Sequence, residues 1–121
     1  MRFAVPTVAS ALILSGCATS QADFTRGVVP IEQDRWMMRI AENYPSRALR
    51  MEEEGRVSLT VTVGNLGRVT QCRITRSSGS VILDQAACDG VTRYARFEPA
   101  LGRDGDPVEG EWSTTVNYEI R

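Results

Sequence analysis

The chain has 121 residues with 14 basic and 15 acidic side chains, and hydrophobic residues make up 42% of it. The net charge of −1 argues against a nucleic-acid-binding protein, which usually carries a basic excess to neutralise phosphates. The sequence contains no histidine, and every basic residue is arginine. This excludes histidine-based catalytic dyads and triads, histidine-ligated zinc and lysine-dependent sites. We therefore expect a non-enzymatic protein without catalytic residues, cofactor or metal.

The first residues are typical of an exported protein. Arg2 supplies a positive start, and an apolar run follows from Phe3 to Leu14. Even when it is extended to Gly16, the run is shorter than the roughly 20 residues that a membrane-spanning helix needs. The pattern therefore favours a signal peptide over residues 1–16.

Residues 14–17, Leu-Ser-Gly-Cys, resemble the lipobox of bacterial lipoproteins. The resemblance implies that the chain is cut before Cys17 and that this cysteine is acylated on sulfur. Two or three acyl chains, at roughly 0.8 kcal/mol per buried methylene, anchor a protein stably. Ala18 stands where inner-membrane lipoproteins often carry Asp, which favours the outer membrane and a domain that faces the periplasm. The alternative is an ordinary signal peptide that happens to contain a cysteine.

Residues 18–33 lack a sustained hydrophobic period and contain Gly27 and Pro30. We interpret residues 17–33 as a flexible, lipid-anchored tether and residues 34–121 as the folded domain. A flexible segment of this length has a reach of roughly 20–24 Å, so the domain would stay close to its membrane.

Two cysteines remain once Cys17 is assigned to the anchor. Cys72 and Cys88 would lie beyond the membrane in an oxidising environment, and we predict a disulfide between them. On the chain-entropy model, the bridge would stabilise the fold by about 3 kcal/mol. Two buried thiols are the alternative. A metal site would lack ligands, and a redox pair would lack a C-x-x-C motif.

Two short helices are predicted at the start of the domain. Asp34 can cap a helix that runs to Asn43 and is broken by Pro45. Residues 46–54 are predicted to form a second helix that Gly55 stops. The apolar face of the first helix comprises Trp36, Met37, Ile40 and Tyr44.

A β-hairpin is predicted next. Residues 57–63 alternate between apolar and polar side chains, which is typical of a half-buried strand. After a glycine-rich turn, the chain is expected to return as a strand over residues 68–76. Because Val69 is out of phase with Cys72, we expect a β-bulge between these two residues.

A longer helix and a last strand complete the predicted elements. The helix is expected over about residues 81–95, with Asp84 in its first turn, where the helix dipole favours an anion. Its core stripe comprises Leu83, Ala87, Val91 and Tyr94. Residues 112–121 alternate again up to the chain end, which predicts a strand with one apolar and one polar face.

The element order and a series of short motifs resemble the C-terminal domain of the TonB family over residues 44–121. No single motif is specific, but their order is. The motifs are Tyr44-Pro45 with Ala48 and Gly55, V-x-L-x-V-x-V over 57–63, Gly67-x-Val69, Ser77-Ser78-Gly79, Leu83-Asp84 with Ala86-Ala87, Arg96-Phe97-x-Pro99-Ala100 and Gly105-x-Pro107-Val108. The resemblance implies an α+β fold in which the hairpin and the C-terminal strand form a small antiparallel sheet, with a helix packed on one face.

The last strand carries the function that the resemblance implies. A strand at a sheet edge offers unpaired backbone groups to which another strand can be added. In the TonB family, this edge receives a short extended segment of an outer-membrane transporter. The equivalent edge here is Ser113, Thr114, Thr115, Val116, Asn117 and Tyr118. The alternatives are an idle edge, a strand-paired homodimer, or an envelope scaffold lipoprotein with no transport role.

The sequence departs from energy-transducing TonB proteins in two respects. Such members carry a transmembrane helix with a histidine and a long proline-rich arm, whereas this chain has no histidine, only a short apolar run, and one proline in the predicted tether. We therefore expect a lipoprotein binding module related to TonB-dependent transport and not a self-sufficient energy transducer.

Two groups of charged residues invite a functional interpretation. The run Glu52–Glu54 could be a general-acid cluster, but a charge run at a helix end is usually solvated. Arg73 and Arg76 could form a basic patch with Arg93 and Arg96. We expect both groups to face solvent without a functional role.

Overall fold

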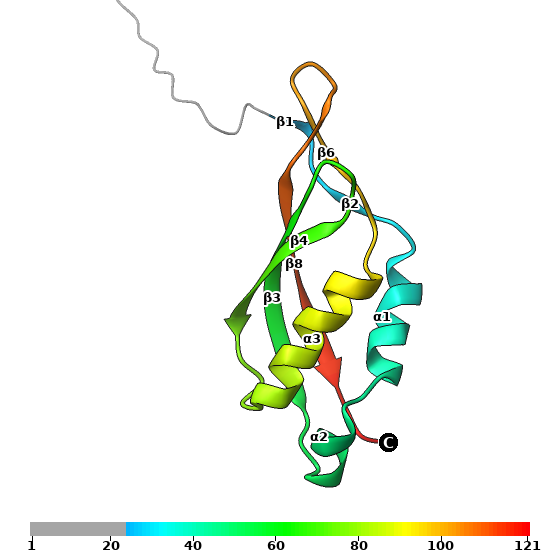
Figure 1. Ribbon diagram of the computed structural model, residues 1–121, viewed down its shortest axis with the longest axis vertical. Helices are drawn as coiled ribbons and strands as arrows, with labels where there is room; N and C mark the ends of the chain where they lie inside the picture. The colour runs from blue at the N-terminus through cyan, green and yellow to red at the C-terminus, as the bar shows by residue number, and fades with distance from the viewer. Residues whose placement is uncertain (1–23) are drawn as a thin grey trace, which may run out of the picture.

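A three-stranded antiparallel sheet forms the centre of the fold in the computed structural model, which describes residues 24–121 (Figure 1). Its strand order is β4-β3-β8, with β3 (Gly55–Val63) between β4 (Val69–Arg76) and β8 (Gly110–Tyr118). The predicted signal peptide, Cys17 and the first part of the predicted tether lie outside the described residues. The α+β fold predicted from the sequence is confirmed.

The predicted hairpin is confirmed, including its bulge. The apolar residues of β3 are buried, and the strand pairs with β4 over most of its length. Thr62 lies opposite Gln71 and Val63 lies opposite Val69, so Thr70 is the extra residue of a β-bulge. The four buried residues on the helix side of β3 are Val57, Leu59, Val61 and Val63.

Helix α3 (Val81–Tyr94) covers the sheet as predicted (Figure 1). Of its predicted core stripe, Leu83, Ala87 and Val91 are buried, whereas Tyr94 is only half-buried. The hydroxyl of Ser80 accepts a hydrogen bond from the backbone N–H of Leu83 at 3.1 Å and caps the helix.

Helix α1 (Gln33–Glu42) packs against α3 and also contacts β8. Ile40 approaches α3 at Gly90, where a Cβ would lie 3.0 Å from the Ile40 side chain. The predicted cap is wrong: Glu32 occupies the cap position with a left-handed backbone, and Asp34 lies inside the first turn.

No helix within residues 24–121 is long and apolar enough to cross a membrane.

Helix α2 (Ser46–Arg50) is shorter than the predicted 46–54 helix. Glu52 adopts a positive φ of 54°, and the backbone N–H of Glu53 returns to the carbonyl of Ala48 at 2.8 Å. A left-handed residue of this kind ends a helix, so Glu52 and not Gly55 is the stop. Gly55 instead begins β3.

The predicted flexible tether is wrong for residues 24–33. β1 (Phe24–Arg26) pairs with β6 (Ala100–Gly102), and β2 (Val29–Pro30) pairs with β5 (Phe97–Glu98). β6 also pairs with β7 (Pro107–Val108), and Figure 1 shows these strands at the end of the molecule opposite α2 and the C-terminus. This part of the chain therefore belongs to the folded unit.

Candidate functional site

The predicted binding strand lies at an edge of the sheet. Among the strands that the structure describes, β8 pairs only with β3. The register runs from Gly55 opposite Tyr118 to Val63 opposite Gly110 over nine consecutive residue pairs without a shift. The edge that faces away from β3, which we call the free β8 edge, therefore offers a regular row of backbone donors and acceptors.

Aromatic packing holds β8 from its helix side. The Trp112 ring lies edge-on to Trp36 of α1, with centroids 5.7 Å apart, and to Phe97 of β5 at 5.1 Å. Trp36 in turn donates its indole N–H to the Ile31 carbonyl at 2.9 Å. Val116 and Tyr118 are buried on the same face. These aromatic contacts fix the helix side of β8 to α1 and β5.

The opposite face of β8 is polar, and two of its hydroxyls are paired with the neighbouring strand. The Ser113 and Thr60 hydroxyl oxygens lie 2.7 Å apart, and those of Thr115 and Ser58 lie 3.0 Å apart. These are cross-strand neighbours in the register. These small side chains therefore form hydrogen bonds toward β3 and not toward the free β8 edge.

The end of β8 is tied to the loop before β3. The backbone N–H of Ile120 donates to the Glu54 carboxylate at 2.8 Å. Glu53 accepts a hydrogen bond from the Ser80 hydroxyl at 2.5 Å. The expectation that Glu52–Glu54 is only a solvated charge run is therefore wrong for two of its members, which hold neighbouring segments in place.

The opposite edge strand, β4, differs from β8 in regularity and charge. Its pairing with β3 shifts at both ends, with extra residues at Thr70 and Thr75. It carries Arg73 and Arg76, both exposed, and no acidic residue. Bulges and charged side chains are devices that keep an edge strand from pairing further.

All four arginines of the possible basic patch were expected to face solvent, but one of them does not. Arg73, Arg76 and Arg93 are exposed, but Arg96 is half-buried. Its guanidinium donates to the carbonyls of Ala95 and Arg93 at 2.7 and 3.1 Å. Arg96 thus stabilises the chain between α3 and β5.

In residues 24–121, no group of three or more metal-ligating side chains lies close enough to hold a metal ion.

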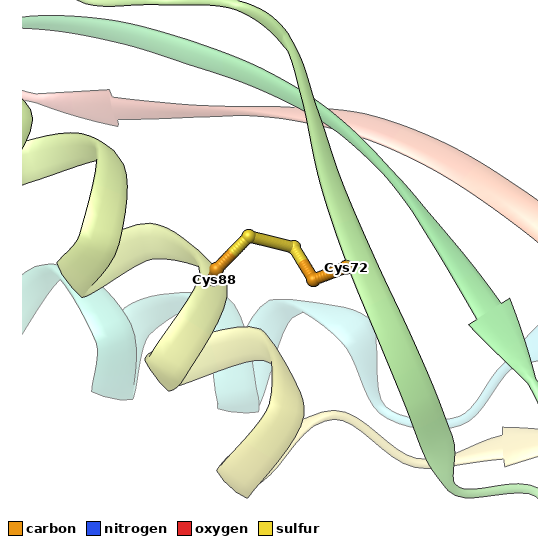
Figure 2. Close-up of a disulfide and its surroundings, with 2 residues drawn as sticks. All are labelled: Cys72 and Cys88. Carbon is orange, nitrogen blue, oxygen red and sulfur yellow. A yellow bond between two sulfur atoms is a disulfide. The ribbon is translucent and has the colours of Figure 1, made fainter.

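Figure 2 shows the predicted Cys72–Cys88 disulfide, which joins β4 to α3. The two Cα atoms lie 5.8 Å apart, within the usual range for a disulfide. The alternative of two buried thiols is not observed. Cys17, the predicted acylation site, lies outside the described part of the chain.

A groove of about 500 Å³ beside the end of β8 was not predicted. It is lined by Met38, Ala41, Glu42, Tyr44, Leu49 and residues 117–121. The sequence pattern gives no sign of the groove because Met38 and Leu49 do not belong to the buried faces of their helices. Both are exposed, Met38 by 61% and Leu49 by 42%.

The loop before α3 contains a second unpredicted network. The Asp84 carboxylate accepts hydrogen bonds from the Ser78 backbone N–H at 2.9 Å and from the Ser77 and Ser78 hydroxyls at 2.5 and 2.7 Å. Burial opposes ionisation of Asp84, but these hydrogen bonds outweigh it and lower the pKa of the carboxyl. The Ser-Ser-Gly motif therefore has a structural role.

Residues 41–120 match the family model described as Gram-negative bacterial TonB protein C-terminal. The chain belongs to this family. The TonB resemblance predicted from the sequence is thus confirmed, and the regular edge strand described above is the last strand of a TonB C-terminal domain.

Two curated TonB proteins are similar to the domain in sequence. The chain is 37% identical to protein tonB2 of Pseudomonas aeruginosa over 81 residues, which cover 66% of this chain and 29% of that protein. It is 40% identical to protein TonB of Haemophilus influenzae over 67 residues, covering 50% of this chain and 25% of the relative. The chain therefore spans less than a third of the length of these relatives.

Two solved TonB C-terminal domains share the fold. The solution structure from Pseudomonas aeruginosa superposes with a TM-score of 0.55 at 22% identity and covers 78% of this chain and 87% of that chain. The Helicobacter pylori domain gives a TM-score of 0.51 at 20% identity and covers 88% of this chain and 98% of that chain.

Proposed function

We propose that this protein is a periplasm-facing lipoprotein whose TonB-type domain binds an extended segment of a partner by strand addition to the free β8 edge. The partner is the N-terminal segment of an outer-membrane, TonB-dependent transporter. The observation that carries the proposal is the unshifted pairing of β8 with β3, which leaves the other edge of β8 regular over Ser113–Tyr118. Main-chain hydrogen bonds to such an edge provide affinity with little demand on side-chain identity.

The contrast between the two edges supports β8 as the binding strand. Edges that natural proteins protect from pairing carry bulges and charges, as β4 does at Thr70, Arg73 and Arg76. Over Ser113–Tyr118, β8 carries no charged side chain. It has small hydroxyls at Ser113 and Thr115 on its polar face and is held by aromatic rings on the other face. An added strand therefore meets a preformed template, which reduces the entropy cost of binding.

The proposed anchor at Cys17 would hold the domain close to its membrane. β1 begins at Phe24, so seven residue steps separate the anchor from the folded unit. At 3.3–3.6 Å per residue, these steps span at most about 25 Å. This distance is shorter than a proline-rich arm across the periplasm would provide. It supports a binding module held at one membrane, in agreement with the expectation that the chain alone does not transduce energy.

A titration of the ¹⁵N-labelled protein with a synthetic peptide from the N-terminal segment of such a transporter tests the proposal. We expect the largest backbone amide shifts at Ser113–Tyr118, with smaller shifts in β4. Two matched peptides carry N-methyl groups at one or the other set of alternate residues. The peptide whose methyl groups replace the N–H donors that face β8 should bind at least tenfold more weakly than the other, since several hydrogen bonds are lost. Absence of β8 shifts with peptides from several transporters would contradict strand addition.

The same edge could pair with a second copy of the chain. In that case, sedimentation would show a dimer, and dilution would move the β8 amide signals without any peptide. A monomer that shifts only on peptide addition supports the transporter segment as the occupant. Co-purification with cell-wall components and no strand addition would instead support the scaffold alternative.

A further inference from the structure

The groove beside the end of β8 exposes apolar side chains that the core does not use. Met38 of α1 and Leu49 of α2 form one side of it, and residues 117–121 form the other. The charged side chains along it are Glu42, Glu119 and Arg121. A groove of about 500 Å³ has the size of a small ligand site and accommodates a few aliphatic side chains.

The groove is continuous with the free β8 edge. Asn117 and Tyr118 belong to the last part of the edge and also line the groove. α1 contacts β8 and lies on the same side of the sheet as Trp112, whose ring packs on Trp36. A strand added to β8 therefore points every second side chain toward α1 and the groove.

The other side chains of an added strand face a polar surface. They lie beside Ser113 and Thr115, which are both exposed and whose hydroxyls pair with Thr60 and Ser58 on the side of the sheet away from the helices. Cross-strand neighbours on one face of a sheet interact most favourably when their chemistry matches. An added strand is therefore expected to alternate between apolar residues on the α1 side and polar residues on the other side.

We propose that the groove is the side-chain subsite of the strand-addition edge and that it receives an apolar residue of an amphipathic partner segment. This inference rests on the proposed function. The segment alternates apolar residues on the α1 side with small polar residues on the other side. The apolar residue that lies nearest the end of β8 packs against Met38 and Leu49. The unbranched, polarisable side chain of Met38 adapts to different aliphatic or aromatic residues, which suits a module that binds segments of varied sequence.

Two synthetic peptides of identical composition test the alternation. One is Val-Thr-Val-Thr-Val-Thr-Val, and the other is Val-Val-Val-Val-Thr-Thr-Thr, each with a lysine at both ends for solubility. The alternating peptide can present all its valines to the α1 side, whereas the block peptide presents half of them. We expect the alternating peptide to bind about tenfold more tightly, as the extra apolar burial predicts, and to shift the methyl signal of Met38.

A pair of methionine variants tests the groove itself. Met38→Gln removes hydrophobicity from the groove with little change in length. Met51→Gln is the matched control, because Met51 is similarly exposed, at 58%, and does not line the groove. We expect Met38→Gln to weaken binding of the alternating peptide about three- to tenfold and Met51→Gln to leave it unchanged.

The outcomes separate this inference from the proposed function. If the β8 amides shift but the two variants bind equally well, or the two peptides bind equally well, the subsite inference is overturned and strand addition stands. If neither these peptides nor the transporter peptides shift the β8 amides, both proposals fail. Selective weakening by Met38→Gln together with β8 shifts supports the subsite.

Discussion

The ring of Tyr118 packs edge-on against the ring of Tyr44, with centroids 5.3 Å apart and an interplanar angle of 80°. This contact joins the end of β8 to the segment between α1 and α2. The Tyr44 hydroxyl donates to the Glu53 carbonyl. The Tyr118 hydroxyl is buried and has no hydrogen-bond partner among the described residues. The two tyrosines therefore share one ring contact, but only the Tyr44 hydroxyl has a hydrogen-bond partner among the described residues.

Tyr118→Phe is expected to stabilise the fold by about 1 kcal/mol, because it removes a buried hydroxyl that lacks a partner. Tyr44→Phe is the matched control and should lower the free energy of unfolding by a similar amount, since the Glu53 carbonyl loses its donor. Urea denaturation of the two variants gives both values. Equal destabilisation by the two changes would show that the Tyr118 hydroxyl has a partner in solution.

Tyr118 should also ionise only in strongly alkaline solution. Burial first, and then the nearby Tyr44 and Asp89, raise its pKa from 10.0 to about 12. Because the folded state holds this proton more tightly, Tyr118 contributes stability below about pH 10 that is lost as the pH rises toward 12. The fall in unfolding free energy over this range should be smaller in Tyr118→Phe. A fall of the same size in both proteins would assign the effect to other groups.

Loss of the disulfide between Cys72 and Cys88 should destabilise the protein by about 3 kcal/mol, because the bridge restricts the unfolded chain. The double variant Cys72→Ser with Cys88→Ser tests this by thermal or urea denaturation. A reductant should destabilise the wild type and leave the double variant unchanged. Mass spectrometry of the unreduced protein that detects two free thiols would contradict the bridge.

Asp84→Asn should destabilise the fold by about 1–2 kcal/mol near neutral pH, because the carboxylate accepts three hydrogen bonds in the loop before α3. The lowered pKa makes this contribution present above the usual aspartate pKa and lost as the pH falls through the folded value. The difference between wild type and variant should therefore shrink in acid. Asp89→Asn, an exposed position on the same helix, is the control and should have little effect.

Cys17→Ala should release the protein from the membrane fraction, because the proposed acyl chains would be its attachment. Fractionation of cells that express each form measures the change. Cys17→Ser, which also lacks the thiol, should behave in the same way. Retention of both variants in the membrane fraction would show that another segment holds the protein there.

The sequence alone determined the parts of the fold that have a period. The alternation over 57–63 predicted β3, and the spacing of Leu83, Ala87, Val91 and Tyr94 predicted α3. The phase break predicted a bulge between Val69 and Cys72, and the structure places its extra residue at Thr70. Burial on one face repeats every two residues in a strand and about every 3.6 in a helix, so these patterns are visible without the tertiary structure. Counting cysteines predicted the disulfide in the same direct way.

Only the tertiary structure decided the remaining features. β1 and β2 are three and two residues long, too short for a period, and they exist because their backbones pair with β6 and β5 far along the chain. The groove is formed by α1, α2 and the end of the chain. Its exposed residues Met38 and Leu49 lie outside the periodic apolar faces of their helices, so the sequence pattern does not mark them. Backbone hydrogen bonds do not depend on side-chain type, and a groove depends on where separate segments meet. A local pattern of residues therefore records neither of them.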